Sequence, residues 1–178
     1  MSAQRLGQHF LEDTDVINTI IAAADLSSED TVLEVGPGRG ALTGHLVEQA
    51  GRVLLLEFDE DLCNRLAQKY ASADNVRVLN VDARDFGSDV DPWTRETDYK
   101  VVANLPYYAA SPITRNFLES TRKPTSMVIM IQREVANDMS AKPDDMSLLS
   151  LAIQIYSTAE HVVDAPPECF NPPPKVHS

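Results

Sequence analysis

The chain has 178 residues, with 15 lysines and arginines against 27 aspartates and glutamates, for a formal net charge of −12. This length suits one domain with a hydrophobic core, the 43% of hydrophobic residues argues against a disordered chain, and no apolar run is long enough to span a membrane. The acidity disfavours a nucleic-acid binder, because phosphate contacts need a basic surface. The charge is unevenly distributed, however: residues 1–99 hold 19 acidic and 8 basic side chains, whereas residues 100–178 hold 8 acidic and 7 basic side chains.

Helix and strand patterns alternate along the chain. The predicted helices are a stripe from Val16 to Ala24 capped by Asp13, a helix through Leu42 and Leu46, one capped by Asp59, one starting at Ser111-Pro112, Arg133 to Ser140, and Leu148 to Ser157. The predicted strands are Thr31 to Val35, Val53 to Phe58, Val76 to Val81, Lys100 to Ala103, Ser126 to Ile131 and, as a sixth candidate, His161 to Val163. This alternation predicts an α/β fold with a mostly parallel central sheet and helices on both faces.

Ligands of such sheets bind beyond the carboxyl ends of the strands, near the point where the strand order reverses. Polar or glycine-rich loops follow the strands that end at Val35, Phe58, Val81 and Ala103. We therefore expect the functional site to be built from these four loops.

The first of these loops contains Gly36, Gly38 and Gly40, and glycines there allow a tight turn and close approach of the backbone to a ligand. Glu57 ends the second strand, where a carboxylate can accept hydrogen bonds from the ribose hydroxyls of an adenosine, and Asp82 follows the third strand, where it could accept from an adenine amino group. The loop fits NAD as well as S-adenosylmethionine. The acidic first half of the chain favours the cationic S-adenosylmethionine.

The loop after the fourth strand reads Asn104-Leu105-Pro106-Tyr107, which resembles the signature of methyltransferases that modify adenine amino groups in nucleic acid. The adenine amine is a poor nucleophile, because its lone pair is delocalised into the ring. Acceptors on the Asn104 side chain and the Leu105 backbone would favour a pyramidal amine, and Pro106 would stiffen the turn. Tyr107 would stack on the flipped base. This chemistry needs no metal and no covalent nucleophile.

Seven motifs extend the resemblance, in order, over nearly the whole chain. They are GQHFL (7–11), LEVGPGRGALT (33–43), LEFDEDL (56–62), NVDARDF (80–86), NLPYYAASPI (104–113), MIQREVA (130–136) and FNPPPKVHS (170–178). Together they resemble the KsgA type of ribosomal RNA small-subunit adenine N6-dimethyltransferase. One departure is Met146-Ser147, where members of that family often have Tyr-Gly.

The resemblance implies a Rossmann-like class I methyltransferase that uses S-adenosylmethionine to dimethylate adenines of small-subunit ribosomal RNA during ribosome maturation. It implies further roles for site residues: His9 and Leu11 would cover the cofactor, Gly36 would contact its methionine part, Glu57 its ribose and Asp82 its adenine, Asn104 would border the methyl group, and Phe170 would close the second face of the target base.

The resemblance also implies that residues 1–178 are the cofactor-binding catalytic domain and that a helical RNA-docking domain would follow it. The substrate would be the immature small ribosomal subunit. Two widely separated cysteines, Cys63 and Cys169, and a polar stretch 1–11 without a signal-peptide pattern predict a reduced cytoplasmic protein. We expect a monomer without a metal or a membrane partner.

Three alternatives stay open. One is a large-subunit ribosomal RNA methyltransferase of the macrolide-resistance type, which more often has isoleucine at the position of Leu105. Another is an NAD-dependent oxidoreductase, supported by the glycine loop and Glu57 alone. The third is a non-catalytic RNA-binding or ribosome-assembly factor, against which the intact Asn104 to Tyr107 motif argues.

Overall fold

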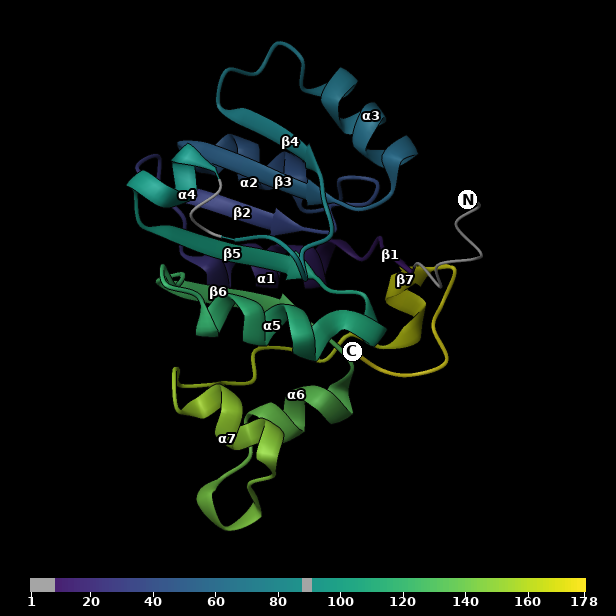
Figure 1. Ribbon diagram of the computed structural model, residues 1–178. Helices are drawn as coiled ribbons and strands as arrows, with labels where there is room; N and C mark the ends of the chain where they lie inside the picture. Colours follow the sequence, from purple (N-terminus) through teal and green to yellow (C-terminus); the bar gives the residue numbers. More distant parts are fainter. Residues whose placement is uncertain (1–8, 88–90) are drawn as a thin grey trace.

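The computed structural model describes residues 9–87 and 91–178, so Gly7 and Gln8 of the first motif lie outside the described residues. A five-stranded sheet forms its centre, and every pair of neighbouring strands is parallel, in the order β4-β3-β2-β5-β6 (Figure 1). The strands are β2 (Thr31–Val35), β3 (Arg52–Glu57), β4 (Val76–Asn80), β5 (Tyr99–Asn104) and β6 (Ser126–Met130). The predicted parallel α/β sheet is confirmed.

Helices cover both faces of this sheet, and Figure 1 shows α5 in front of it and α1 and α2 behind it. The helices are α1 (Thr14–Ala24), α2 (Thr43–Gln49), α3 (Glu60–Lys69), α4 (Pro92–Glu96), α5 (Ala110–Glu119), α6 (Arg133–Met139) and α7 (Leu148–Gln154). Alternate residues of β2 face opposite layers, because Val32 packs with α1 and α2 while Leu33 packs with α5. The three central strands, β3, β2 and β5, are therefore largely buried, whereas the edge strands β4 and β6 are more exposed.

Two predicted helix caps are confirmed. The Asp13 carboxylate accepts a hydrogen bond from the Val16 amide at 2.9 Å, and the Asp59 carboxylate accepts from the amides of Asp61 and Leu62. Each cap satisfies amides that have no partner within the helix, so these acids fix where α1 and α3 begin.

The fold differs from the sequence prediction in three places. A short 3-10 helix, η2 (Tyr107–Ala109), leads into α5, which therefore begins before the predicted cap Ser111. Helix α4, which Asp91 caps, has no counterpart among the predicted helices. The predicted sixth strand, His161 to Val163, does not form: a groove lies between this segment and β6, so its backbone does not reach the edge of the sheet.

A second, two-stranded sheet joins the beginning and the end of the described chain. Strand β1 (Phe10–Leu11) pairs antiparallel with β7 (Phe170–Asn171), with Leu11 opposite Phe170. Leu11 and Phe170 are both buried in the core layer that contains α1. This sheet places the N-terminal segment over the carboxyl ends of β2 and β3. Within residues 9–87 and 91–178, no helix is both long and apolar enough to cross a membrane.

Candidate active site

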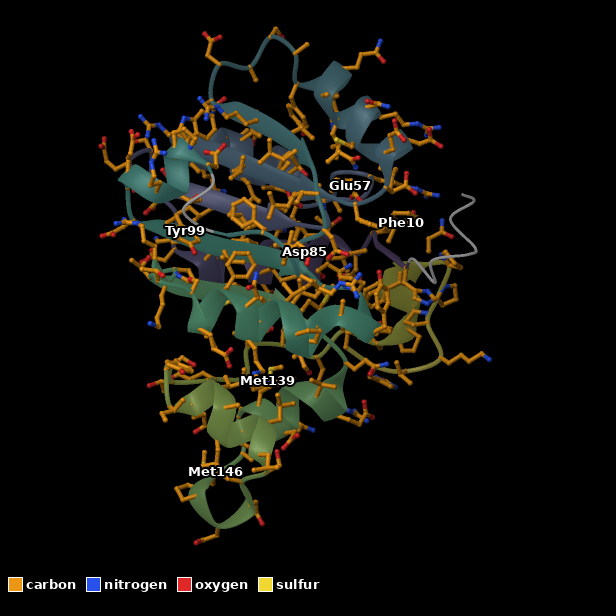
Figure 2. The ribbon with its side chains drawn as sticks, viewed as in Figure 1. Phe10, Glu57, Asp85, Tyr99, Met139 and Met146 are labelled. Carbon is orange, nitrogen blue, oxygen red and sulfur yellow. The ribbon has the colours of Figure 1, made fainter. Side chains whose placement is uncertain are left out.

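A cavity opens at the carboxyl ends of the parallel strands, next to the end of β2, which lies between β3 and β5 in the sheet. It is lined by the loops after β2, β3, β4 and β5 and by residues 9–11. Figure 2 shows Glu57, from β3, and Phe10, from β1, at this end of the sheet. The four loops predicted to form the site therefore meet in one cavity.

The glycine loop after β2 has a backbone that side chains disfavour. Gly36, Gly38 and Gly40 have φ angles of +65°, +56° and +87°. A Cβ on Gly38 would lie 3.1 Å from the Phe10 ring, so that ring would have to shift by a few tenths of an ångström to admit a side chain. The Gly36 amide donates to the Leu56 carbonyl at 2.9 Å, which holds the loop against the end of β3.

Glu57 is nearly buried, with a relative exposure of 5%, and lines the cavity. One carboxylate oxygen accepts from the Gly38 amide at 3.0 Å, and the other accepts from the Asp59 amide at 2.9 Å. Burial raises the pKa of this carboxyl, while the two amides oppose that shift. The side chain is thus held in one orientation at the cavity wall.

Glu34 is a cavity-lining acid that the sequence analysis did not single out. It lies inside the buried strand β2 with a relative exposure of 2%, and its carboxyl accepts a hydrogen bond from the Thr43 hydroxyl at 2.7 Å. Burial raises its pKa to about 8, and the nearby Glu57 adds to that rise. An acid in the middle of an otherwise apolar strand was the signal that could have identified it.

Asp82 lines the cavity at the end of β4. Its carboxylate accepts from the Arg84 guanidinium, with Arg84 Nη2 2.5 Å and Nε 3.0 Å from its oxygens, and this pairing lowers its pKa. The sequence analysis did not anticipate Arg84 as a partner. The pair keeps Asp82 ionised and orients it at the cavity rim.

Asn104 ends β5, Leu105 and Pro106 follow it, and all three line the same cavity. The Leu105 amide donates to the Met130 carbonyl at 3.0 Å, and Pro106 is extended, with φ −63° and ψ 130°. Among the residues that the structure describes, neither the Asn104 side chain nor the Leu105 carbonyl has a hydrogen-bond partner. A Cβ on Gly36 would lie 3.6 Å from the Asn104 carbonyl oxygen, so the two loops touch. Two free acceptors therefore stand beside the glycine loop.

Tyr107 begins η2 and is half-buried at the cavity wall. Its hydroxyl is 2.7 Å from the Ser178 Oγ, and burial raises its pKa. The His9 ring stacks on the Tyr107 ring, with 6.0 Å between ring centres and 24° between the planes. The aromatic side chain predicted to stack on a base thus has one face turned toward the N-terminal segment.

The structure brings all but one of the predicted site residues together. His9 and Leu11 line the cavity with the loops, but Phe170 is not among the lining residues. Phe170 is only 4% exposed and packs in the core through β7. Its predicted place on the second face of a bound base stays a prediction.

The cavity chemistry fits a cationic nucleoside. Acidic side chains line it, namely Glu34, Glu57, Asp59 and Asp82. Arg39 is the sole lysine or arginine among the described lining residues, and its guanidinium lies 4.1 Å from the centre of the Phe10 ring and 3.9 Å from Glu12. A pyrophosphate would meet more negative than positive charge here, whereas a sulfonium compound would be attracted. In the described part of the chain, no cluster of three His, Cys, Asp or Glu residues could hold a metal ion.

Comparison with known protein families shows to which family the chain belongs. Residues 2–178 match the family described as ribosomal RNA adenine dimethylase. The chain is 45% identical over 173 residues to a ribosomal RNA small subunit methyltransferase A of Dehalococcoides mccartyi, covering 97% of this chain and 59% of that protein. It is 39% identical over 180 residues to the protein of that name in Alkaliphilus oremlandii, covering 99% and 63%. The chain thus spans about three fifths of the length of these curated relatives.

Two solved structures resemble it over almost its whole length. A dimethyladenosine transferase from Plasmodium falciparum has a TM-score of 0.82 at 29% identity, covering 95% of this chain and 60% of that one. The 23S rRNA methyltransferase ErmE has a TM-score of 0.80 at 29% identity, covering 94% and 66%. The predicted methyltransferase type of Rossmann-like fold is therefore confirmed.

Proposed function

Since the chain belongs to the ribosomal RNA adenine dimethylase family, we propose that it transfers methyl groups from S-adenosylmethionine to the exocyclic amino groups of adenines in small-subunit ribosomal RNA. The product is dimethyladenosine, formed during ribosome maturation. The curated relatives named as small subunit methyltransferases support this choice of substrate.

The observation that carries the proposal is the free pair of acceptors next to the glycine loop. The Asn104 amide oxygen and the Leu105 carbonyl have no hydrogen-bond partner among the described residues, yet both line a cavity with Gly36 and Glu57. The Asn104 side-chain oxygen is not among the buried side-chain atoms that lack a partner, so it is accessible, and a ligand with two N–H groups could donate to both acceptors. The adenine amino group has two such hydrogens.

The proposed reaction is a direct transfer to that amine. Asn104 and Leu105 accept its two N–H bonds, which directs the nitrogen lone pair toward the glycine loop. S-adenosylmethionine supplies a methyl group already activated by its sulfonium. The S–CH3 bond would break as the N–CH3 bond forms, S-adenosylhomocysteine would leave, and the cationic amine would lose its proton to solvent after the transfer, so we assign no general base. The chain's contribution is alignment of the two reactants and electrostatic support for the amine as it becomes positive.

The cofactor contacts in this proposal follow the cavity wall. Gly36 and Gly38 lie under the methionine part, Glu57 accepts from the ribose, and Asp82 accepts from the adenine amino group while still paired with Arg84. Leu11 covers the cofactor from the N-terminal side, and Asn104 borders the transferred methyl group. His9, which lines the same side of the cavity, shares this cover.

The proposal also covers the location, the oligomeric state and the substrate particle. We propose a cytoplasmic monomer that acts without a metal on the immature small subunit, with residues 1–178 as the catalytic domain. The helical RNA-docking domain expected from the resemblance stays a prediction.

A large-subunit substrate is the second candidate, because the TM-score to the 23S rRNA methyltransferase ErmE nearly equals that to the dimethyladenosine transferase. Neither an NAD-dependent oxidoreductase nor a non-catalytic assembly factor gains support from the family match.

Parallel incubation of small and large subunits with isotopically labelled S-adenosylmethionine, followed by primer extension on both RNAs, separates the two substrates. The proposal expects stops at adenines of the small-subunit RNA. Stops confined to the large-subunit RNA would move the assignment to the second candidate, and no stop in either RNA would contradict both.

A further inference from the structure

Ser178 contacts the wall of the cavity from outside. It does not line the cavity that contains Asn104 and Tyr107, and it lines instead the separate groove along β6. Its hydroxyl nevertheless lies 2.7 Å from the Tyr107 hydroxyl. Ser178 is buried, with a relative exposure of 6%, so little solvent reaches its side of this contact. Tyr107 therefore stands between the cavity on one side and Ser178 on the other.

Backbone hydrogen bonds fix the position of Ser178. Its amide donates to the Ala165 carbonyl at 3.0 Å, and its main-chain oxygen accepts from the Ala165 amide at 2.6 Å. The preceding carbonyl, that of His177, accepts from the Arg133 amide at 3.0 Å. These bonds join the segment before the 3-10 helix η4 (Pro167–Cys169) to the start of α6. The serine hydroxyl is thus presented to Tyr107 from a backbone that is held on two sides.

The hydroxyl end of the Tyr107 ring depends on Ser178 for its anchor. The Tyr107 backbone belongs to η2, a helix of three residues, in which the Ala109 amide donates to the Pro106 carbonyl at 2.9 Å. Among the described residues, Ser178 is the hydrogen-bond partner of the Tyr107 hydroxyl. The neighbouring Tyr108 also lines the cavity, but it is 63% exposed and its hydroxyl has no hydrogen-bond partner in the described part of the chain. Of these two adjacent tyrosines, Tyr107 is the one whose ring is held at both ends.

We propose that Ser178 is a positioning residue for methyl transfer, whose hydroxyl holds the Tyr107 ring in the orientation in which that ring meets the target adenine. The proposal rests on the proposed function, because it takes Tyr107 as the side chain that stacks on the base. A ring that is held at its backbone and at its hydroxyl cannot swing, so the stacking surface is in place before the base arrives. Ser178 itself touches neither reactant, since it is not part of the cavity lining.

A double-mutant cycle separates this role from a purely structural one. Ser178→Ala removes the hydroxyl but keeps the bonds to Ala165, because those bonds use the backbone of Ser178. Tyr107→Phe removes the same contact from the other side and keeps the ring that stacks. The third variant combines both substitutions. The matched control is Ser140→Ala, because the Ser140 hydroxyl donates to the Ala136 carbonyl of its own helix, α6, at 2.8 Å and lies away from the cavity lining.

The measured quantity is kcat/KM for unmethylated small-subunit particles with labelled S-adenosylmethionine. Ser178→Ala and Tyr107→Phe should each lower it by about two- to tenfold, the range that one hydrogen bond between neutral groups supplies. The double variant should lose no more than either single variant, because the contact is already absent in each of them. Ser140→Ala should match the wild-type protein. Affinity for S-adenosylmethionine, measured by calorimetry, should stay within about twofold of the wild-type value in every variant.

The inference is overturned if the losses of the two single variants add up in the double variant, because Ser178 would then act by a route other than the Tyr107 hydroxyl. It is also overturned if Ser178→Ala keeps the wild-type kcat/KM, or if it loses cofactor affinity as strongly as kcat/KM. Each of these results leaves the proposed function standing, since the wild-type protein still methylates adenine. A wild-type protein that binds S-adenosylmethionine but methylates no adenine in the particles would contradict the proposed function and the inference together.

Discussion

The Glu57 carboxylate, at the end of β3, accepts a hydrogen bond from the Gly38 amide at 3.0 Å, across the mouth of the cavity. Its second oxygen accepts from the Asp59 amide, in the cap of α3. The acid proposed to bind ribose is therefore also the one that shapes the glycine loop. A substitution of Glu57 should therefore weaken ribose binding and disturb the glycine loop at the same time.

Glu57→Gln tests this coupling. The amide of glutamine has only one oxygen, so it cannot accept from both backbone amides, and it lacks the charge that attracts a cation. We expect affinity for S-adenosylmethionine to fall by at least about tenfold in calorimetry. Glu48→Gln, at an exposed position of α2, should bind as the wild-type protein does. Unchanged binding by Glu57→Gln would remove Glu57 from the site.

Gly38→Ala, in the glycine loop, and Gly44→Ala, in the helix α2 that follows the loop, form a matched pair of variants. Gly38 has φ +56° and a Cβ there would crowd the Phe10 ring, whereas a Cβ on Gly44, in α2, has nothing within 4 Å. Gly38→Ala should therefore weaken cofactor binding about tenfold or more through strain in the loop. Gly44→Ala should leave binding intact and stabilise the fold by up to about 1 kcal/mol.

Thermal unfolding and calorimetry of both glycine variants measure these effects. Equal cofactor affinities in the two variants would show that the backbone of Gly38 does not approach the ligand.

Asn104→Ala tests the methyl-transfer chemistry. It removes one acceptor of the adenine amino group and leaves the glycine loop and Glu57 in place, so methyl transfer should fall by about 10²-fold or more while cofactor affinity changes by only a fewfold. Asn137→Ala, at an exposed position of α6, is the control. Initial rates with labelled S-adenosylmethionine give the first quantity and calorimetry the second. A fully active Asn104→Ala protein would refute the assignment.

Glu34 makes stability depend on pH. Its pKa rises from the ordinary 4.5 to about 8 in the folded protein, because burial disfavours the charged carboxylate. The folded state therefore binds more protons than the unfolded state between these two values, and stability should fall as pH rises through that window and then level off. Glu34→Gln keeps an oxygen for the Thr43 hydroxyl and has no charge to bury.

Urea denaturation at pH 5.5, 7 and 8.5 follows this effect. The gain in free energy of unfolding of Glu34→Gln over the wild-type protein should grow with pH, by about 3 kcal/mol between pH 5.5 and 8.5. Glu48→Gln should show no such trend. Parallel pH curves for wild type and Glu34→Gln would show that Glu34 ionises in the fold at its ordinary pKa.

Most of the fold could be predicted from residues that lie close together in the sequence. The strand from Thr31 to Val35 was predicted with its observed bounds, and the caps Asp13 and Asp59 formed as expected, because each depends on residues within a few positions. The pairing of Phe10–Leu11 with Phe170–Asn171 joins segments about 160 residues apart. Two-residue strands carry no periodicity, so no local pattern could predict that sheet.

The same distinction holds at the site. The glycines, Glu57 and Asn104 stand at strand ends, and parallel topology brought them together as predicted. The partnership of Asp82 with Arg84, the burial of Phe170 and the stacking of His9 on Tyr107 depend on side-chain directions that only packing decides. Val162 is 52% exposed beside the groove along β6, so the predicted sixth strand does not pack this side chain against the sheet.

The central claim is that this chain methylates adenine amino groups of small-subunit ribosomal RNA. Its most direct test is mass spectrometry of nucleosides from small-subunit RNA after incubation of unmethylated particles with the protein and methyl-labelled S-adenosylmethionine. The account predicts labelled N6,N6-dimethyladenosine in the wild-type reaction and none with Asn104→Ala. Label absent from adenosine, or found in dimethyladenosine of large-subunit RNA alone, would contradict it.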